Sequence, residues 1–254
     1  MSKTLQAVSP GLHQHLRLYK GQLQGGSTQD AATGEDSRSL PLASQLPPGR
    51  LIELPAATPT NCHMTQAVAS LRYAQHCGKT CAWVQIEGGS LYPPDLADNG
   101  IDLAALVVVH VPRRARHAGL AKAAEILLRS GGFGMVIVDL WGIPSDRPSP
   151  LQTAWQGRLF GMAREHNSWL ILLSSPKVAP HKHAHPRSHR EHGGTPHFSP
   201  SSLGPLISLR VAGERRRLAP GHFAITPIIE KDKSGCLSHR PLAEEYRRGP
   251  WGLY

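Results

Sequence analysis

Two carboxylates in the sequence stand where nucleotide hydrolysis could be carried out. Asp139 ends the apolar run MVIVD, and Glu87 follows the apolar run TCAWVQI. An acid at the end of a buried strand can order Mg²⁺, and a glutamate near it can activate a water molecule. Alternatively, Asp139 only hydrogen-bonds the loop that follows it, and neither carboxylate is catalytic. The choice depends on whether the chain also has groups that hold phosphate.

The segment between the apolar run that ends at Leu54 and the next helical pattern has the length of a phosphate-binding loop. Such a loop reads G-x-x-x-x-G-K-[ST]: its glycines let backbone N–H groups wrap the phosphates, its Lys neutralises charge, and its hydroxyl holds Mg²⁺. Here Ala56 and Asn61 replace the glycines, Cys62 replaces the Lys, and His63 replaces the hydroxyl residue. We therefore expect a degenerate loop, vestigial carboxylates, no ATPase activity and no cofactor. Weak nucleotide binding, or another anion at the helix N-terminus, is the open alternative.

The elements around these residues alternate between strand-like and helix-like patterns. Apolar runs are separated by patterns of helical spacing at residues 64–76, 120–130 and 151–166. This alternation predicts an α/β fold with a mostly parallel sheet covered on both faces. The stretches LISLRVAGERRRL and HFAITPIIEKDKSG then predict two further strands that pair as a hairpin.

Three regions follow from composition. Residues 1–39 are expected to hold a short helix and a flexible linker, 40–235 the core with a His/Arg-rich loop at 177–197, and 236–254 a mobile tail. The tail shows no core pattern, but its Trp251 and Tyr254 are typical anchors for a protein partner.

No apolar run approaches the roughly 20 residues needed to cross a bilayer. Since the start also lacks an apolar signal segment, we expect a cytoplasmic protein without a membrane partner.

The formal charge of +10 is concentrated late in the chain. Residues 151–254 hold 15 of the 28 Lys and Arg but 7 of the 18 Asp and Glu. Such an excess favours polyanions such as nucleic acid, although it is also typical of a merely solubilising surface. The loop at 177–197 could be a solvated insertion, a DNA contact that strengthens in acid, or a chelating set built on His181, His183 and His185. We favour the insertion and expect no metal.

Several phrases, in this order, resemble the RecA core. LPPGRLIEL resembles the lead into its phosphate loop, AQHCGKTCAWVQIEGG its second strand, SGGFGMVIVDL the approach to its Walker-B strand, and NSWLILLSS the strand before its second DNA-binding loop. The resemblance covers about residues 40–240 and implies a RecA-like αβα sandwich with a mostly parallel central sheet. Of the family's functional residues, it carries over only Glu87 and Asp139.

The departures indicate a branch of that family. The phosphate loop is degenerate, the N-terminal polymerisation helix is replaced by something short, and the long C-terminal domain is absent. Together with LPPGRLIEL and the RSGGFG phrase, this is similar to ImuA, a small RecA-like member of a bacterial mutagenesis cassette whose relatives include SulA-like proteins. The resemblance implies an accessory role in SOS translesion synthesis, through contact with ImuB, a catalytically inactive Y-family polymerase relative. RecA, a damage-inducible replicative-type polymerase and DNA are further candidate partners, and DNA would place the protein at the nucleoid.

In RecA, the loops after the Walker-B strand and after the next strand hold DNA, and their counterparts here are about residues 142–151 and 174–198. The basic residues that the resemblance and the late charge make candidates for nucleic-acid contact are Arg147, Lys177, Lys182, Arg187, Arg190, Arg215, Arg216 and Arg217. The last three could also form a simple polar turn. Two other functions stay open: a weak ATP-dependent RecA-like DNA-binding protein, and a cell-division inhibitor.

Overall fold

The computed structural model describes residues 41–56, 62–141, 150–174, 203–233, 235, 237 and 242–248, with backbone only at 150–153. All of them belong to one unit, Arg38–Tyr254. The expected N-terminal helix and linker and the His/Arg-rich loop lie outside the described residues, so those predictions stay untested.

Five parallel strands form the centre of the sheet. They are β1 (Leu51–Pro55), β2 (Cys81–Ile86), β3 (Leu106–Val111), β4 (Met135–Asp139) and β5 (Trp169–Ser174), in the order β3-β2-β4-β5-β1. All residues of β1, β2, β4 and β5 are buried, because helices cover both faces; this is why these strands read as continuous apolar runs. Strand β3 is half-exposed, since no described strand pairs with its outer edge.

Three strands that pair antiparallel with one another extend the sheet beyond β1, and the first of them pairs parallel with β1. They are β6 (Leu209–Ala219), β7 (His222–Asp232) and β8 (Glu245–Arg248), which continue the order as β1-β6-β7-β8. The expected hairpin of the last two runs is confirmed, with Gly221 at positive φ in its turn.

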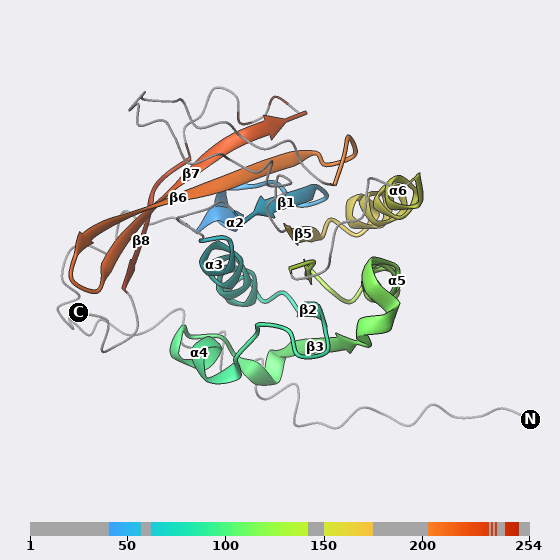
Figure 1. The fold of residues 1–254 in the computed structure, drawn as a ribbon, viewed down its shortest axis with the longest axis horizontal. Helices are drawn as coiled ribbons and strands as arrows, with labels where there is room; N and C mark the ends of the chain where they lie inside the picture. The colour runs from blue at the N-terminus through green and yellow to red at the C-terminus, as the bar shows by residue number, and fades with distance from the viewer. Residues whose placement is uncertain are drawn as a thin grey trace, which may run out of the picture. The chain divides into compact units, whose positions relative to one another are not determined.

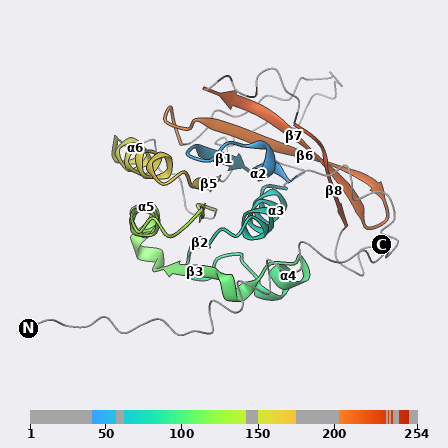
Figure 2. The same cartoon turned by 180° about the vertical axis from the view of Figure 1, so that it is seen from behind.

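The helices form one layer on each face of the sheet, as Figures 1 and 2 show from opposite sides. Helices α2 (Leu42–Gln45) and α3 (His63–His76) lie on one face, with α4 (Pro93–Asp98) beside α3; α5 (Arg116–Arg129) and α6 (Pro150–Glu165) lie on the other. Two short 3₁₀ turns, η2 (Leu103–Ala105) and η3 (Arg113–Ala115), flank β3. None of the helices in the described segments is long and apolar enough to cross a membrane.

Alternation along each strand separates two hydrophobic cores. In β1, Ile52 and Leu54 pack towards α2 and α3, whereas Leu51 packs towards α5 and α6. This arrangement is the αβα sandwich with a mostly parallel sheet that the sequence predicted.

The expectation of a tail without core pattern is wrong for residues 242–248. Strand β8 pairs with β7, and Leu242 and Glu245 are buried. A carboxylate oxygen of Glu245 accepts a 2.7 Å hydrogen bond from the backbone N–H of Leu42, which ties this segment to α2. In the sequence, the four residues of β8 resemble a tail, because the strand with which they pair lies elsewhere in the chain.

Candidate functional site

The described residues on either side of the segment where a phosphate loop would lie are buried. Ala56 is buried, and its backbone N–H donates to the carbonyl of Ser174 (2.8 Å), so the β1–β5 ladder continues one residue beyond the strand. Cys62 and His63, at the start of α3, are buried as well. Asn61 and the rest of residues 57–61 lie outside the described residues.

Cys62 packs directly against the backbone of β6. A Cβ atom placed on Gly213 would lie 2.3 Å from the Cys62 sulfur and 2.7 Å from the Gln66 side-chain oxygen, so any larger residue would force these two side chains to shift. Burial raises the pKa of the Cys62 thiol to about 11; Arg215 opposes the shift and Glu245 adds to it. The thiol is therefore neutral at physiological pH and cannot supply the charge of a phosphate-loop Lys.

His63 stacks on Trp141, with ring centroids 5.3 Å apart and planes inclined by 27°. Burial lowers the pKa of the imidazole to about 4, so the ring is neutral near pH 7. The position that would hold a metal-binding hydroxyl thus carries an uncharged ring packed on an indole. Trp141 is a residue that sequence reasoning missed, since only the fold brings the end of β4 to the start of α3.

Both carboxylate oxygens of Asp139 accept hydrogen bonds from neighbouring loops. One carboxylate oxygen accepts from the backbone N–H of Trp141 (2.8 Å), and the other accepts from the Ser90 hydroxyl (3.3 Å). Burial raises the pKa of Asp139, and the two hydrogen bonds oppose that shift. Glu87 is exposed, and its backbone N–H donates to the Val111 carbonyl. The two carboxylates do follow adjacent parallel strands, β2 and β4, as the sequence indicated.

A RecA-like fold implies ATP with Mg²⁺ at this corner, and the described residues do not fit it. Phosphates need a cation and open backbone N–H groups, but the described flank offers a neutral thiol, a neutral stacked imidazole and a strand packed against the first turn of α3. We therefore derive no chemical step through a nucleotide.

The candidate nucleic-acid residues divide into two groups. Arg215, Arg216 and Arg217 lie within strand β6, so the alternative of a simple polar turn is excluded, and the nucleic-acid alternative stays a prediction. The guanidinium of Arg215 lies 5.1 Å from the centre of the Phe223 ring, and Arg216 lies 3.8 Å from a carboxylate oxygen of Glu244. Outside the described residues are Arg147, Lys177, Lys182, Arg187 and Arg190, together with the candidate partner anchors Trp251 and Tyr254.

Arg210, on the same strand, pairs with carboxylates in the protein interior. Its Nε lies 2.7 Å from a carboxylate oxygen of Glu230 and 3.8 Å from one of the fully buried Glu53. The Ser174 hydroxyl donates to the other Glu53 oxygen (2.6 Å). This arginine neutralises buried carboxylates and is not available to a ligand.

Metal ligands do not gather in the described segments: no three His, Cys, Asp or Glu side chains there are placed to hold an ion. The alternating His181, His183 and His185 lie outside these segments, so the metal alternative for them is untested.

Comparisons with known proteins bear on the fold. No protein-family model and no curated protein matches this sequence. The crystal structure of the RadB recombinase is similar in structure, with a TM-score of 0.52 over 80% of this chain and 88% of that chain, at 17% sequence identity. At that identity the likeness concerns the fold alone. With the strand order and the two helical layers, it shows that this chain has a RecA-like α/β fold.

Proposed function

We propose that this protein is a non-catalytic RecA-like accessory factor of the DNA-damage (SOS) response. In this proposal it promotes translesion synthesis by binding an ImuB-type polymerase relative, with RecA as a second candidate partner. The observation that carries the proposal is a RecA-like fold whose nucleotide corner is filled by the stacked rings of His63 and Trp141 and by the contact of Cys62 with Gly213. A fold that keeps its framework but not its phosphate-binding groups suits an adaptor, because an adaptor needs surfaces and no reaction centre.

The direct test is capture of the purified ImuB-type partner by the tagged full chain, with nuclease present to remove bridging DNA. We expect capture without added nucleotide and equal capture by the Glu87→Gln variant, because neither result depends on hydrolysis. ATP hydrolysis that disappears in Glu87→Gln would instead establish the ATP-dependent DNA-binding alternative. Failure of the wild-type chain to capture the partner would refute the adaptor role.

The candidate anchors Trp251 and Tyr254 need a test that spares β8. Removing residues 236–254 would delete the buried Leu242 and Glu245 and would confuse binding with folding. The double substitution of Trp251 and Tyr254 by Ala leaves β8 intact. We expect it to lower partner capture at least about tenfold, which is the loss of one strong anchor. Unchanged capture would show that these aromatics are not the contact.

A further inference from the structure

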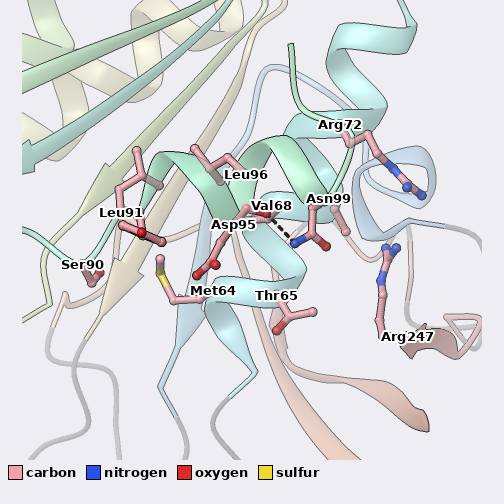
Figure 3. Close-up of a pocket in the computed structure, with 12 residues that line it drawn as sticks. Met64, Thr65, Val68, Arg72, Ser90, Leu91, Asp95, Leu96, Asn99 and Arg247 are labelled. Carbon is pink, nitrogen blue, oxygen red and sulfur yellow. Dashed lines mark hydrogen bonds between the residues drawn. The ribbon is translucent and has the colours of Figure 1, made fainter. Parts of the chain in front are cut away.

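A cavity of about 290 Å³ runs along α3, from Met64 in its first turn to Arg72. Its walls come from three places distant in sequence: α3, the loop and helix α4 that follow β2, and Arg247 of β8 (Figure 3). The pairing of β8 with β7 therefore supplies one of the two arginines that line the cavity.

One end of this cavity carries an excess of positive charge. Figure 3 shows the guanidinium groups of Arg72 and Arg247 at the same end. Arg247 donates to a carboxylate oxygen of Glu245 (3.0 Å), and its buried Nε has no hydrogen-bond partner among the described residues. Arg72 makes no salt bridge within the described segments, and Glu245 also accepts from the backbone N–H of Leu42. Arg247 thus pairs with the buried Glu245, whereas Arg72 acts on that carboxyl only through its charge, which opposes the burial that raises the pKa of Glu245.

The remainder of the cavity has a mixed lining. Met64 and Val68 of α3, together with Leu91 and Leu96, supply its apolar side chains, and the exposed Tyr92 is close by in sequence. In Figure 3, Ser90 and Leu91 lie at the end away from the arginines, and Asp95 lies between the two ends. The cavity therefore has a basic end and, beyond it, apolar side chains that surround one carboxylate.

We propose that this cavity binds an extended peptide segment of a partner protein, with a hydrophobic side chain against the apolar residues Met64, Val68 and Leu96 and an adjacent Asp or Glu on Arg72 and Arg247. This deepens the proposed function, on which it rests, by naming the surface an adaptor would use. Guanidinium groups pair with carboxylates in a forked geometry, and an apolar pocket of this size accepts one large side chain. A nucleic-acid backbone is disfavoured, because it carries a phosphate at every nucleotide and would place further negative charge beside Asp95, whereas the peptide places one carboxylate on the arginines and a hydrophobic side chain against the apolar residues.

Methionine-methyl NMR tests the proposal on the full chain. Besides Met1, the chain has three methionines: Met64 lines the cavity, Met135 is fully buried in β4, and Met162 lies in α6 on the opposite face. The probes are a blocked Gly-Leu-Glu-Gly peptide, the matched Gly-Leu-Lys-Gly peptide, and single-stranded oligothymidylate. We expect the acidic peptide to shift the Met64 signal saturably, with Met135 and Met162 unmoved, and the Lys peptide to bind at least about tenfold more weakly.

Two variants with opposite expected effects distinguish a change in peptide affinity from a loss of the folded structure. Arg72→Gln should weaken the acidic peptide about tenfold, and Asp95→Asn should strengthen it a few-fold, because the first removes attraction and the second removes repulsion. Arg164→Gln, on an exposed position of α6, is the matched control and should change nothing. Equal binding of both peptides, no effect of Arg72→Gln, or a Met64 shift produced by oligothymidylate alone would each overturn the proposal.

A failure of the peptide-site proposal can be told apart from a failure of the proposed adaptor role. If wild-type protein captures the ImuB-type partner and Arg72→Gln captures it equally well, the cavity is not the partner site while the adaptor role stands. If wild-type protein captures no partner, the adaptor role fails, and a partner site at the cavity fails with it even where the peptide binds.

Discussion

The two ends of α3 offer opposite chemistry. At its first turn, Cys62 and His63 are buried and neutral and pack against Gly213 and Trp141. Two turns later, Arg72 faces a cavity that Arg247 also lines, and the described segments give Arg72 no salt bridge. One helix therefore carries neutral, packed side chains at the corner where a RecA-like fold holds nucleotide, and a charged side chain at a cavity farther along. The contrast shows that the two ends of α3 differ in charge and in accessibility.

The largest expected effect tests whether the closed corner is neutral. His63 has a folded pKa of about 4, below the ordinary value of 6.5. Since the unfolded chain binds the proton more readily, stability is fully present above pH 6.5 and is lost as the pH falls towards 4, by about 3 kcal/mol for this group.

The His63→Phe variant keeps a ring on Trp141 but cannot titrate. The difference in unfolding free energy between wild type and variant, followed by urea denaturation from pH 7.5 to 4, should therefore grow in favour of the variant on acidification. A pH-independent difference would mean that His63 is not buried in neutral form.

The next prediction concerns the close packing of Gly213 in β6 against Cys62 at the start of α3. Gly213→Ala places a methyl group 2.3 Å from the Cys62 sulfur, so we expect a loss of about 2 kcal/mol in unfolding free energy. Adding Cys62→Ala should restore part of it, because the clash partner is shortened. The control is Gly161→Ala in α6, where nothing lies within 4 Å of the added Cβ and a gain of about 0.5–1 kcal/mol is expected. Equal effects at the two glycines would contradict this close packing.

A further prediction asks whether positive charge continues from the cavity onto the hairpin. Arg215, Arg216 and Arg217 lie on β6, and the first and last of them alternate with Arg216 across the sheet. If they hold nucleic acid, their triple Ala variant should bind oligothymidylate more weakly and reduce the salt dependence by about one counterion per lost contact. An unchanged affinity and slope would restrict the charged surface to the cavity.

The smallest effect concerns Asp139. Its pKa is raised by burial, so the folded state holds the proton more tightly, and stability falls as the pH rises from the unfolded pKa through the folded one. Asp139→Asn can keep the hydrogen bonds to Trp141 and Ser90 without a buried charge. We expect a modestly higher melting temperature at pH 7 than in wild type, with the advantage shrinking below the unfolded pKa. A marked loss at pH 7 would show that the carboxylate form is needed at this corner.

Local pattern was enough to predict the framework. Continuous apolar runs and helical spacing predicted the parallel strands and α3, α5 and α6, because both signals arise within a few consecutive residues. The changed residues of the phosphate loop, Ala56, Cys62 and His63, could be read for the same reason. The helix over 116–129 begins four residues before its apolar pattern, since Arg116 to Gly119 contribute little to the core.

Tertiary structure alone decided which distant residues meet. The stacking of Trp141 on His63, the approach of Gly213 to Cys62, and the convergence of Arg247 with Arg72 each join segments with no shared local pattern. Strand β8 is four residues long and polar, so only its register with β7 and the buried Glu245–Leu42 hydrogen bond define it. The sequence by itself determined the fold class and the altered corner, whereas the pairing of β8 at the edge of the sheet brought Arg247 to the cavity, because contacts across long loops depend on register and not on periodicity.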